Sequence, residues 1–355
     1  MRYKKEMLDA LKAELRMRRD YLEGIPIGTI YFGGGTPSLL SVDEVSGLLS
    51  AIRDFFVCRE DMEVTLEGNP DNLSFSYLKG LRGVGVNRLS IGVQSINGDV
   101  LASLNRSHKA KAGPASIMDA RKAGFTNFSI DLMYGLPARK AGTWAHELAE
   151  VVCLAPPHIS AYCLTIEPNT VFGHRRARGT FVPVDEAQEV AEFMKLKEVL
   201  GAAGYVHYEI SNFCLAPHYA RHNTNYWQGG LYLGVGPSAH SYDGRSRQYN
   251  VAHNKAYIDS IIGGSLPLRQ EVLRSFEHVN EHIMLGLRTM WGCDTALLKR
   301  MYGYDLFKER EKEITFSMEK GWMVRDGDHL VLTERGQLLA DEIAKDLFCD
   351  EGTHE

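Results

Sequence analysis

The sequence predicts an α/β fold, namely an incomplete (βα) barrel of the TIM type followed by a smaller α+β domain. Short β-rich runs alternate with helical stretches through the first part of the chain, which is typical of βαβ units and a parallel sheet. Each run ends in a polar or glycine-rich turn, which favours a barrel, or part of one, over a doubly wound sheet. Residues 275–346 show the order helix, two strands, helix, which is typical of a winged-helix-like unit.

The first predicted element is an amphipathic helix over residues 4–22. Met7, Leu8, Leu11 and Leu15 recur at roughly helical spacing, with Lys and Glu residues between them. A barrel of strand-then-helix units should open with a strand, so two interpretations stay open. The helix either packs outside a barrel strand that this sequence does not contain, or it is an additional helix at the start of the barrel.

Six predicted strands follow, and each is bounded by turn residues. They are residues 28–32, 63–66, 88–93, 127–132, 158–164 and 206–210. An aromatic and glycine-rich stretch then precedes a predicted helix at 253–262. The chain is therefore divided into three predicted parts: a partial barrel over 1–213, a connecting segment over 214–274, and a C-terminal domain over 275–355.

The composition restricts the classes of protein to consider. The 355 residues are 44% hydrophobic and 24% charged, as in ordinary soluble globular proteins. A formal net charge of −5 argues against a nucleic-acid-binding protein. No apolar run approaches the roughly 18 residues of a membrane span. The N-terminus lacks the apolar stretch of a signal peptide, and the scattered cysteines fit a reducing compartment, so we expect a cytoplasmic protein.

A glycine triplet directly follows the first predicted strand. Gly33 begins the run Gly-Gly-Gly-Thr-Pro-Ser, which contains Gly34, Gly35 and Thr36. Backbone without Cβ atoms can approach a ligand closely, and its free N–H and C=O groups can bind polar ends of that ligand. The alternative interpretation is a tight turn that requires positive φ angles.

Polar side chains also lie near the ends of three later predicted strands. Glu67, Gln94 and Asp131 each occupy such a position, and in a barrel this end holds the active site. Two carboxylates and an amide suit a ligand with an amine and hydroxyls, such as an amino acid joined to a ribose. Arg106 follows in the next helical region and can pair with a carboxylate. The alternative for each side chain is a helix cap or a surface ion pair.

Five motifs in order carry a family resemblance. They are Gly-Gly-Gly-Thr-Pro-Ser at 33–38, Glu-Gly-Asn-Pro at 67–70, Arg-Leu-Ser-Ile-Gly-Val-Gln-Ser at 88–95, Asp-Leu-Met-Tyr-Gly-Leu-Pro at 131–137 and Tyr-Glu-Ile-Ser-Asn-Phe at 208–213. Over nearly the whole chain, the sequence resembles the oxygen-independent coproporphyrinogen III oxidase group of radical S-adenosylmethionine (SAM) proteins. The resemblance implies an incomplete barrel of the radical SAM type with SAM across its mouth. It assigns SAM contacts by motif position to Gly34, Gly35, Thr36, Glu67, Gln94, Arg106 and Asp131.

The segment His-Asn-x-x-Tyr-Trp at 222–227 resembles the heme chaperone branch of that group. This resemblance implies a protein that binds heme and passes it to a recipient protein, at a membrane or in respiration. Imidazoles can ligate iron, and aromatic rings can lie against a porphyrin, so the expected heme contacts are His222, Asn223, Tyr226 and Trp227. The alternative interpretations are an ordinary packed loop and, for the whole protein, an enzyme that oxidatively decarboxylates coproporphyrinogen III.

The family's cluster loop, Cys-x-x-x-Cys-x-x-Cys after the first strand, is not found in this sequence. The six cysteines are too far apart to replace it: Cys58, Cys153, Cys163, Cys214, Cys293 and Cys349. No metal site is therefore expected in the sequence as given, no catalytic residue is assigned, and enzymatic activity stays open. A [4Fe–4S] cluster is expected only if an N-terminal segment is missing. The two hypotheses are a start codon placed too late and a degenerate member that keeps heme handling.

Overall fold

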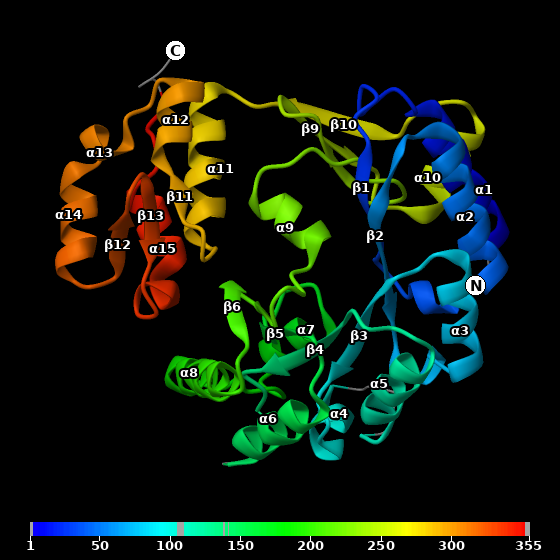
Figure 1. Ribbon diagram of the computed structural model, residues 1–355, viewed down its shortest axis with the longest axis horizontal. Coiled ribbons are helices and arrows are strands. Elements are labelled where there is room, and N and C mark those ends of the chain that lie inside the picture. Colours follow the sequence, from blue (N-terminus) through cyan, green and yellow to red (C-terminus); the bar gives the residue numbers. More distant parts are fainter. Residues whose placement is uncertain (1–2, 105–109, 138, 141, 352–355) are drawn as a thin grey trace. The chain divides into compact units, whose positions relative to one another are not determined.

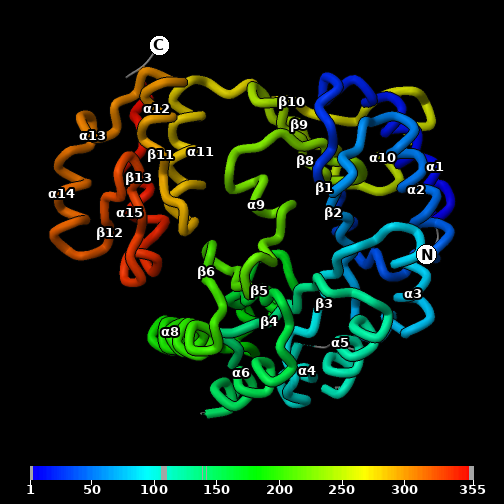
Figure 2. The backbone as a smooth tube through the Cα atoms, viewed as in Figure 1, coloured from blue at the N-terminus to red at the C-terminus, as the bar shows by residue number. Residues whose placement is uncertain are grey.

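The structure is a computed structural model that describes residues 3–104, 110–137, 139–140 and 142–351 (Figure 1). The chain forms two compact units. The first contains Met1–Gly28, Asp43–Met62 and Arg221–Glu355, and the second contains Thr29–Val42 and Glu63–Ala220. Figure 2 follows the chain as it alternates between them, from blue at the N-terminus to red at the C-terminus.

The largest element is an open seven-stranded sheet with the order β1-β2-β3-β4-β5-β7-β6. Strands β2 to β5 are parallel, whereas β7 pairs antiparallel with both β5 and β6. All six predicted strands are present, and the open sheet confirms the expectation of an incomplete barrel. The strand bounds are β1 Ile27–Phe32, β2 Cys58–Gly68, β3 Arg88–Gln94, β4 Phe128–Tyr134, β5 His158–Cys163, β6 Val206–Glu209 and β7 Asn212–Cys214.

Strand β7 was not predicted. It has only three residues, Asn-Phe-Cys, so it offers no alternating pattern to recognise. The structure instead forms a tight antiparallel hairpin in which Glu209 pairs with Asn212.

The central strands bury apolar side chains on one face and polar side chains on the other. On β3, Leu89, Ile91 and Val93 are fully buried, and a Cβ added to Gly113 of α5 would meet the Val93 side chain at 2.8 Å. The helices therefore cover this apolar face. The alternate positions of β3, β4 and β5 carry Arg88, Ser90, Ser129, Asp131, His158 and Ser160. Because parallel sheets are usually apolar on both faces, the polar face is the one expected to hold a site.

Helices and short 3₁₀ turns connect the strands of the second unit. Side-chain N-caps fix several starts: Ser74 accepts from Tyr77 N, and Asp185 accepts from Gln188 N. The elements are η1 Pro37–Leu39, η2 Pro70–Asn72, α3 Phe75–Val84, α4 Gly98–Ser103, α5 Ala112–Lys122, α6 Thr143–Leu154, α7 Val171–Ala177 and α8 Glu186–Ala202.

In the first unit, the N-terminal helix α1 spans Lys4–Met17 and ends earlier than the expected residue 22, because residues 18–24 form turns. Its Ala10 packs in an apolar cluster with Tyr257 and Ile261 of α10. The other elements here are α2 Val42–Phe55, α9 Arg221–Trp227, β8 His240–Tyr242, β9 Ser246–Asn250, α10 Asn254–Ile262 and β10 Leu268–Val272. The three strands form an antiparallel sheet, β10-β9-β8.

The buried carboxylate of Glu14 fastens α1 within the first unit. It accepts hydrogen bonds from Gly236 N (2.8 Å), Asn250 Nδ2 (2.7 Å) and Tyr257 OH (2.5 Å). Arg18 lies one turn later, with its Nη1 3.5 Å from the same carboxylate. The helix is thus tied to the glycine-rich segment that follows α9 in sequence.

The C-terminal residues contain the predicted helices and two-stranded wing, together with a third strand that was not predicted. The short strand β11 pairs with β13 and gives the sheet order β11-β13-β12. The elements are α11 Ser275–Leu287, β11 Cys293–Asp294, α12 Thr295–Tyr302, α13 Leu306–Glu309, α14 Glu311–Glu319, β12 Met323–Asp326, β13 His329–Leu332, η3 Gly336–Leu339 and α15 Ala340–Asp346. None of the helices in the described ranges has the length and apolar character needed to cross a bilayer.

Candidate functional site

The glycine loop after β1 leaves its backbone open on one side. Gly34 and Gly35 are exposed and have φ angles of +73° and +66°, a region in which side chains with a Cβ are strained. A Cβ added to either residue would meet no atom within 4 Å. The turn therefore needs glycine for its conformation, and it also leaves space for a ligand against the backbone. Thr36 is the N-cap residue of η1.

The loops after β1 and β2 are joined by hydrogen bonds. The Glu67 carboxylate accepts from Tyr31 OH at 2.9 Å and from Gly34 N at 3.1 Å. In return, Ser38 Oγ accepts from Asn69 N at 3.1 Å. The motifs at 33–38 and 67–70 are thus hydrogen-bonded to each other at the ends of neighbouring strands.

Glu67 and Asp131 are linked through the strand between them. Glu67 on β2 is in register with Ser90 on β3, and Ser90 Oγ donates to the Asp131 carboxylate on β4, with oxygen distances of 3.1 and 3.3 Å. Burial raises the pKa of Asp131 to about 6, and the negative charge of Glu67 adds to this shift. The structure therefore brings these two predicted residues to the same polar face.

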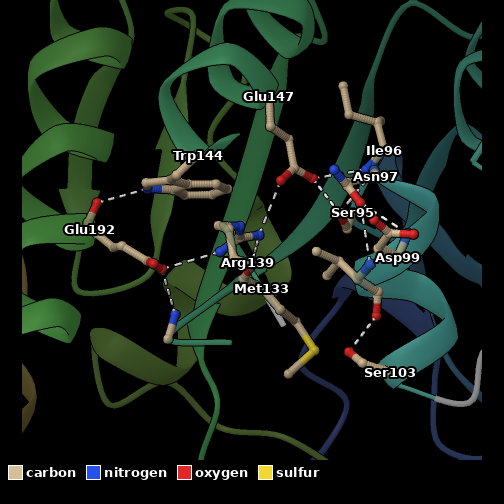
Figure 3. Close-up of polar contacts among 12 residues, drawn as sticks. Ser95, Ile96, Asn97, Asp99, Ser103, Met133, Arg139, Trp144, Glu147 and Glu192 are labelled. Atoms are coloured by element: carbon tan, nitrogen blue, oxygen red, sulfur yellow. Dashed lines mark hydrogen bonds and ion pairs between the residues drawn. The ribbon is translucent and has the colours of Figure 1, made fainter. Parts of the chain in front are cut away.

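Gln94, the last residue of β3, has a strained backbone. Its φ angle is +63°, which is unusual for a residue other than glycine, and the pairing with β4 shifts register at this point. Such a conformation costs roughly 1–2 kcal/mol and persists only where the surroundings hold it. Figure 3 shows what fixes the residues that follow it.

The chain beyond Gln94 is held by a buried carboxylate on α6. Glu147 accepts from Ser95 Oγ at 2.5 Å and from Ile96 N at 2.8 Å (Figure 3). A second carboxylate, Glu192 on α8, accepts from Gly135 N, just beyond β4, at 2.8 Å. Each of the two strand ends is thus fixed by its own glutamate.

Arg139 joins the two glutamates. Its guanidinium lies 3.1 Å from Glu147 Oε2 and 3.1 Å from Glu192 Oε2, and it also donates to Met133 O at 2.9 Å. The Trp144 ring lies 4.2 Å from the guanidinium carbon (Figure 3). The Arg139 and Glu147 side chains are only 1% and 2% exposed, so this network is shielded from water.

Sequence reasoning did not identify this network. Glu192 lies 53 residues beyond Arg139, and Arg139, Glu147 and Glu192 belong to no recognised motif. Ser90, in contrast, had a usable signal, because it alternates with Arg88 and Gln94 on one face of a predicted strand. The predicted residue Arg106 lies outside the described residues.

The four expected heme contacts lie on helix α9 in the first unit. His222 and Tyr226 are one turn apart, with Nε2 and OH separated by 3.1 Å and the rings perpendicular at 5.0 Å. Asn223 and Trp227 are also one turn apart and partly exposed. Tyr226 is 38% exposed, and burial of its hydroxyl raises its pKa to about 12. The segment is therefore a short helix, not an irregular loop.

The residues of the second unit suit SAM. Glu67 and Asp131 supply carboxylates, Gln94 supplies an amide, and the space above Gly34 and Gly35 is open. These groups are appropriate for the amine and hydroxyls of a nucleoside joined to an amino acid.

A [4Fe–4S] cluster has no equivalent set of ligands in the described part of the chain. Within those residues, no three His, Cys, Asp or Glu side chains are grouped as metal ligands.

Two family models match parts of the chain. The Radical SAM superfamily matches residues 3–146, and the HemN C-terminal domain matches residues 275–339. The chain is 35% identical to the heme chaperone HemW of Mycobacterium tuberculosis (strain ATCC 25618 / H37Rv), over 96% of this chain and 85% of that protein. It is also 35% identical to HemW of Bacillus subtilis (95% and 90% covered) and 32% identical to HemW of Escherichia coli (91% and 84%).

Among solved structures, coproporphyrinogen III oxidase (HemN) from Escherichia coli, a radical SAM enzyme, superimposes with a TM-score of 0.85. The superposition covers 98% of this chain and 84% of that one, at 23% sequence identity. This likeness establishes the incomplete-barrel fold together with the C-terminal domain.

Proposed function

Because the chain belongs to the family of the heme chaperone HemW, we propose that it binds heme and transfers it to a recipient protein. The observation that supports this function is the arrangement of α9, on which His222 and Tyr226 share one face. A neutral imidazole can ligate heme iron, and the adjacent rings offer an apolar surface to the porphyrin. His222, Asn223, Tyr226 and Trp227 are the proposed contacts, and the recipient is a protein at a membrane or in respiration.

We further propose that SAM binds at the ends of the barrel strands. Glu67, Gln94 and Asp131 would hold it by hydrogen bonds, beside the open backbone of Gly34 and Gly35. Thr36 and Arg106 join this set on motif position alone. When bound, SAM supplies a sulfonium and an adenosyl group, and the residues named here bind and orient it. A cytoplasmic location is also proposed, because no disulfide joins the described cysteines.

The enzyme alternative, oxidative decarboxylation of coproporphyrinogen III, ranks second. The similarity to HemN supports the fold, whereas the curated relatives with 31–35% identity that are described as heme chaperones support heme handling. An anaerobic assay of the purified protein with coproporphyrinogen III distinguishes the two. Turnover without stable heme binding would reverse this ranking.

The heme proposal is tested by titrating the protein with hemin and recording the Soret band. We expect saturable binding at one site and an altered Soret band in His222→Ala. The matched control is His174→Ala, which removes an exposed imidazole from α7. Identical spectra for wild type and His222→Ala would remove His222 as a ligand, and the absence of saturable binding would refute the function.

The SAM proposal is tested by calorimetry with SAM. Glu67→Ala and Asp131→Ala should each weaken binding about tenfold or more, since one hydrogen bond to a charged group contributes roughly 1.5–3 kcal/mol. Glu186→Ala, at an exposed position in the first turn of α8, is the control. Unchanged affinity in both pocket variants would remove the assignment.

A further inference from the structure

The first glycine of the triplet differs from the other two in its reason for being glycine. Gly33, unlike Gly34 and Gly35, has no positive φ angle, so its backbone conformation is open to other residues. A Cβ added to Gly33 would, however, lie only 2.6 Å from the ring of Tyr31 and 3.0 Å from Glu67 Oε1. Glycine is therefore needed here for space, because the Tyr31 ring and the Glu67 carboxylate both approach this backbone closely.

Two donors fix the Glu67 carboxylate, one at each oxygen. Oε1 accepts from Tyr31 OH at 2.9 Å, and Oε2 accepts from Gly34 N at 3.1 Å. The carboxylate plane cannot rotate without breaking one of these hydrogen bonds. Since an ionised carboxylate can accept about four hydrogen bonds, it still has acceptor capacity for a ligand. The carboxylate is thus oriented before any ligand binds.

The Tyr31 hydroxyl keeps its proton and therefore remains a donor. Burial raises the pKa of Tyr31 far above its ordinary value, and the negative charges of Glu67 and Asp131 add to this shift. The hydroxyl is thus close enough to both candidate SAM carboxylates to be affected by their charge. Its hydrogen bond to Glu67 therefore persists well above neutral pH.

Of the two donors, Tyr31 is the more firmly held. Gly34 is exposed and lies in a loop, whereas Tyr31 belongs to β1, which is hydrogen-bonded in the sheet to β2, the strand that carries Glu67. A glutamate side chain has several rotatable bonds, and a ligand that has to order them binds more weakly. Without the Tyr31 hydroxyl, the Glu67 carboxylate would be held by exposed backbone at one oxygen.

We propose that Tyr31 is a positioning residue for SAM, because its hydroxyl holds the Glu67 carboxylate in the orientation that receives the ligand. The groups of SAM that a carboxylate can receive are donors, namely its ammonium group and its ribose hydroxyls. This inference rests on the proposed SAM binding and assigns a role to a residue outside the set of proposed contacts. Tyr31 acts through Glu67 and does not itself contact SAM.

The test is a double-mutant cycle with SAM, measured by calorimetry on wild type, Tyr31→Phe, Glu67→Ala and the double variant. Tyr31→Phe keeps the ring beside Gly33 and removes only the donor, so SAM affinity should fall about three- to tenfold. In the Glu67→Ala background, the same change should have no further effect, because no carboxylate is left to orient. The matched control, Tyr205→Phe, removes a hydroxyl that donates to Pro156 O at 2.6 Å and should bind SAM like wild type.

The outcomes separate this inference from the proposed SAM site. If Glu67→Ala weakens binding whereas Tyr31→Phe binds like wild type, the positioning role is wrong and the site remains. If Tyr31→Phe weakens binding by the same factor in both backgrounds, Tyr31 acts independently of Glu67, and the inference is refuted. If wild type binds no SAM, or Glu67→Ala keeps full affinity, Glu67 is not a contact and the inference fails with it. Urea unfolding of each variant shows whether a loss of affinity follows from a loss of fold.

Discussion

Arg139 and Glu147 form a buried ion pair, with Nη2 and Oε2 3.1 Å apart, and this pair connects the ends of two barrel strands. Glu147 fixes the chain after Gln94, and Arg139 reaches the backbone of Met133 near the end of β4. Two candidate SAM contacts, Gln94 and Asp131, thus lie on strands whose ends are both hydrogen-bonded to this ion pair.

Replacing Arg139 by methionine should destabilise the protein by about 3–5 kcal/mol, because Glu147 and Glu192 would be left buried without a cation. Urea unfolding measures this free energy. Lys140→Met is a matched control, since Lys140 is the next residue and its side chain is 84% exposed. A loss of less than about 1 kcal/mol in the free energy of unfolding would contradict the role of Arg139 in connecting the two glutamates.

Asp131 should make stability depend on pH in an unusual direction. Its pKa is raised to about 6 in the folded protein, whereas an unfolded aspartate titrates near pH 4. Between these values the folded state binds more protons than the unfolded state, so stability falls as pH rises from about 4 to about 6. The loss is about 3 kcal/mol and is complete above that window.

Asp131→Asn isolates this contribution. The variant cannot ionise at residue 131, so its stability relative to wild type should rise across the same window and then level off. Urea unfolding at several pH values measures the difference, in which the other titrating groups cancel. A constant difference between about pH 4 and 7 would show that burial does not shift this carboxyl group.

The strands could be predicted because their signals are local. The run 88–93 alternates buried apolar and polar residues and ends in a Gln-Ser turn, and the structure gives Arg88–Gln94. The helix α9 could not be predicted, since seven residues with no buried side chain have no apolar periodicity. Strand β7 was not predicted because it is also too short to show a periodic pattern.

For the candidate site as well, some features could be predicted from the sequence and others could not. The positions of Glu67, Gln94 and Asp131 near strand ends follow from counting along each run, although their role in binding stays a prediction. The pairing of Arg139 with Glu192 depends on how α8 packs, and no spacing in the sequence records it. Likewise, the strained φ of Gln94 results from tertiary contacts, because glutamine itself does not favour that conformation.

Glu14 should be essential for the stability of the first unit. Glu14→Gln keeps the size of the side chain but directs an amide NH₂ toward groups that are themselves donors, and it removes the ion pair with Arg18. We expect a loss of about 2–4 kcal/mol in the free energy of unfolding. Glu6→Gln changes an exposed glutamate on the same helix and should cost less than about 0.5 kcal/mol. Similar costs for the two variants would refute the anchoring role.

Two variants of Gln94 distinguish the effect of this residue on stability from its effect on SAM binding. Gln94→Gly relieves a φ of +63° and should stabilise the protein by about 0.5–1 kcal/mol after the entropy of glycine is included. The same variant should weaken SAM binding, because the amide is lost. Gln94→Ala loses the amide but keeps the strain, so it should bind SAM equally weakly without the gain in stability. If Gln94→Gly binds SAM as tightly as wild type, the strained conformation serves the turn alone and the amide is not part of the pocket.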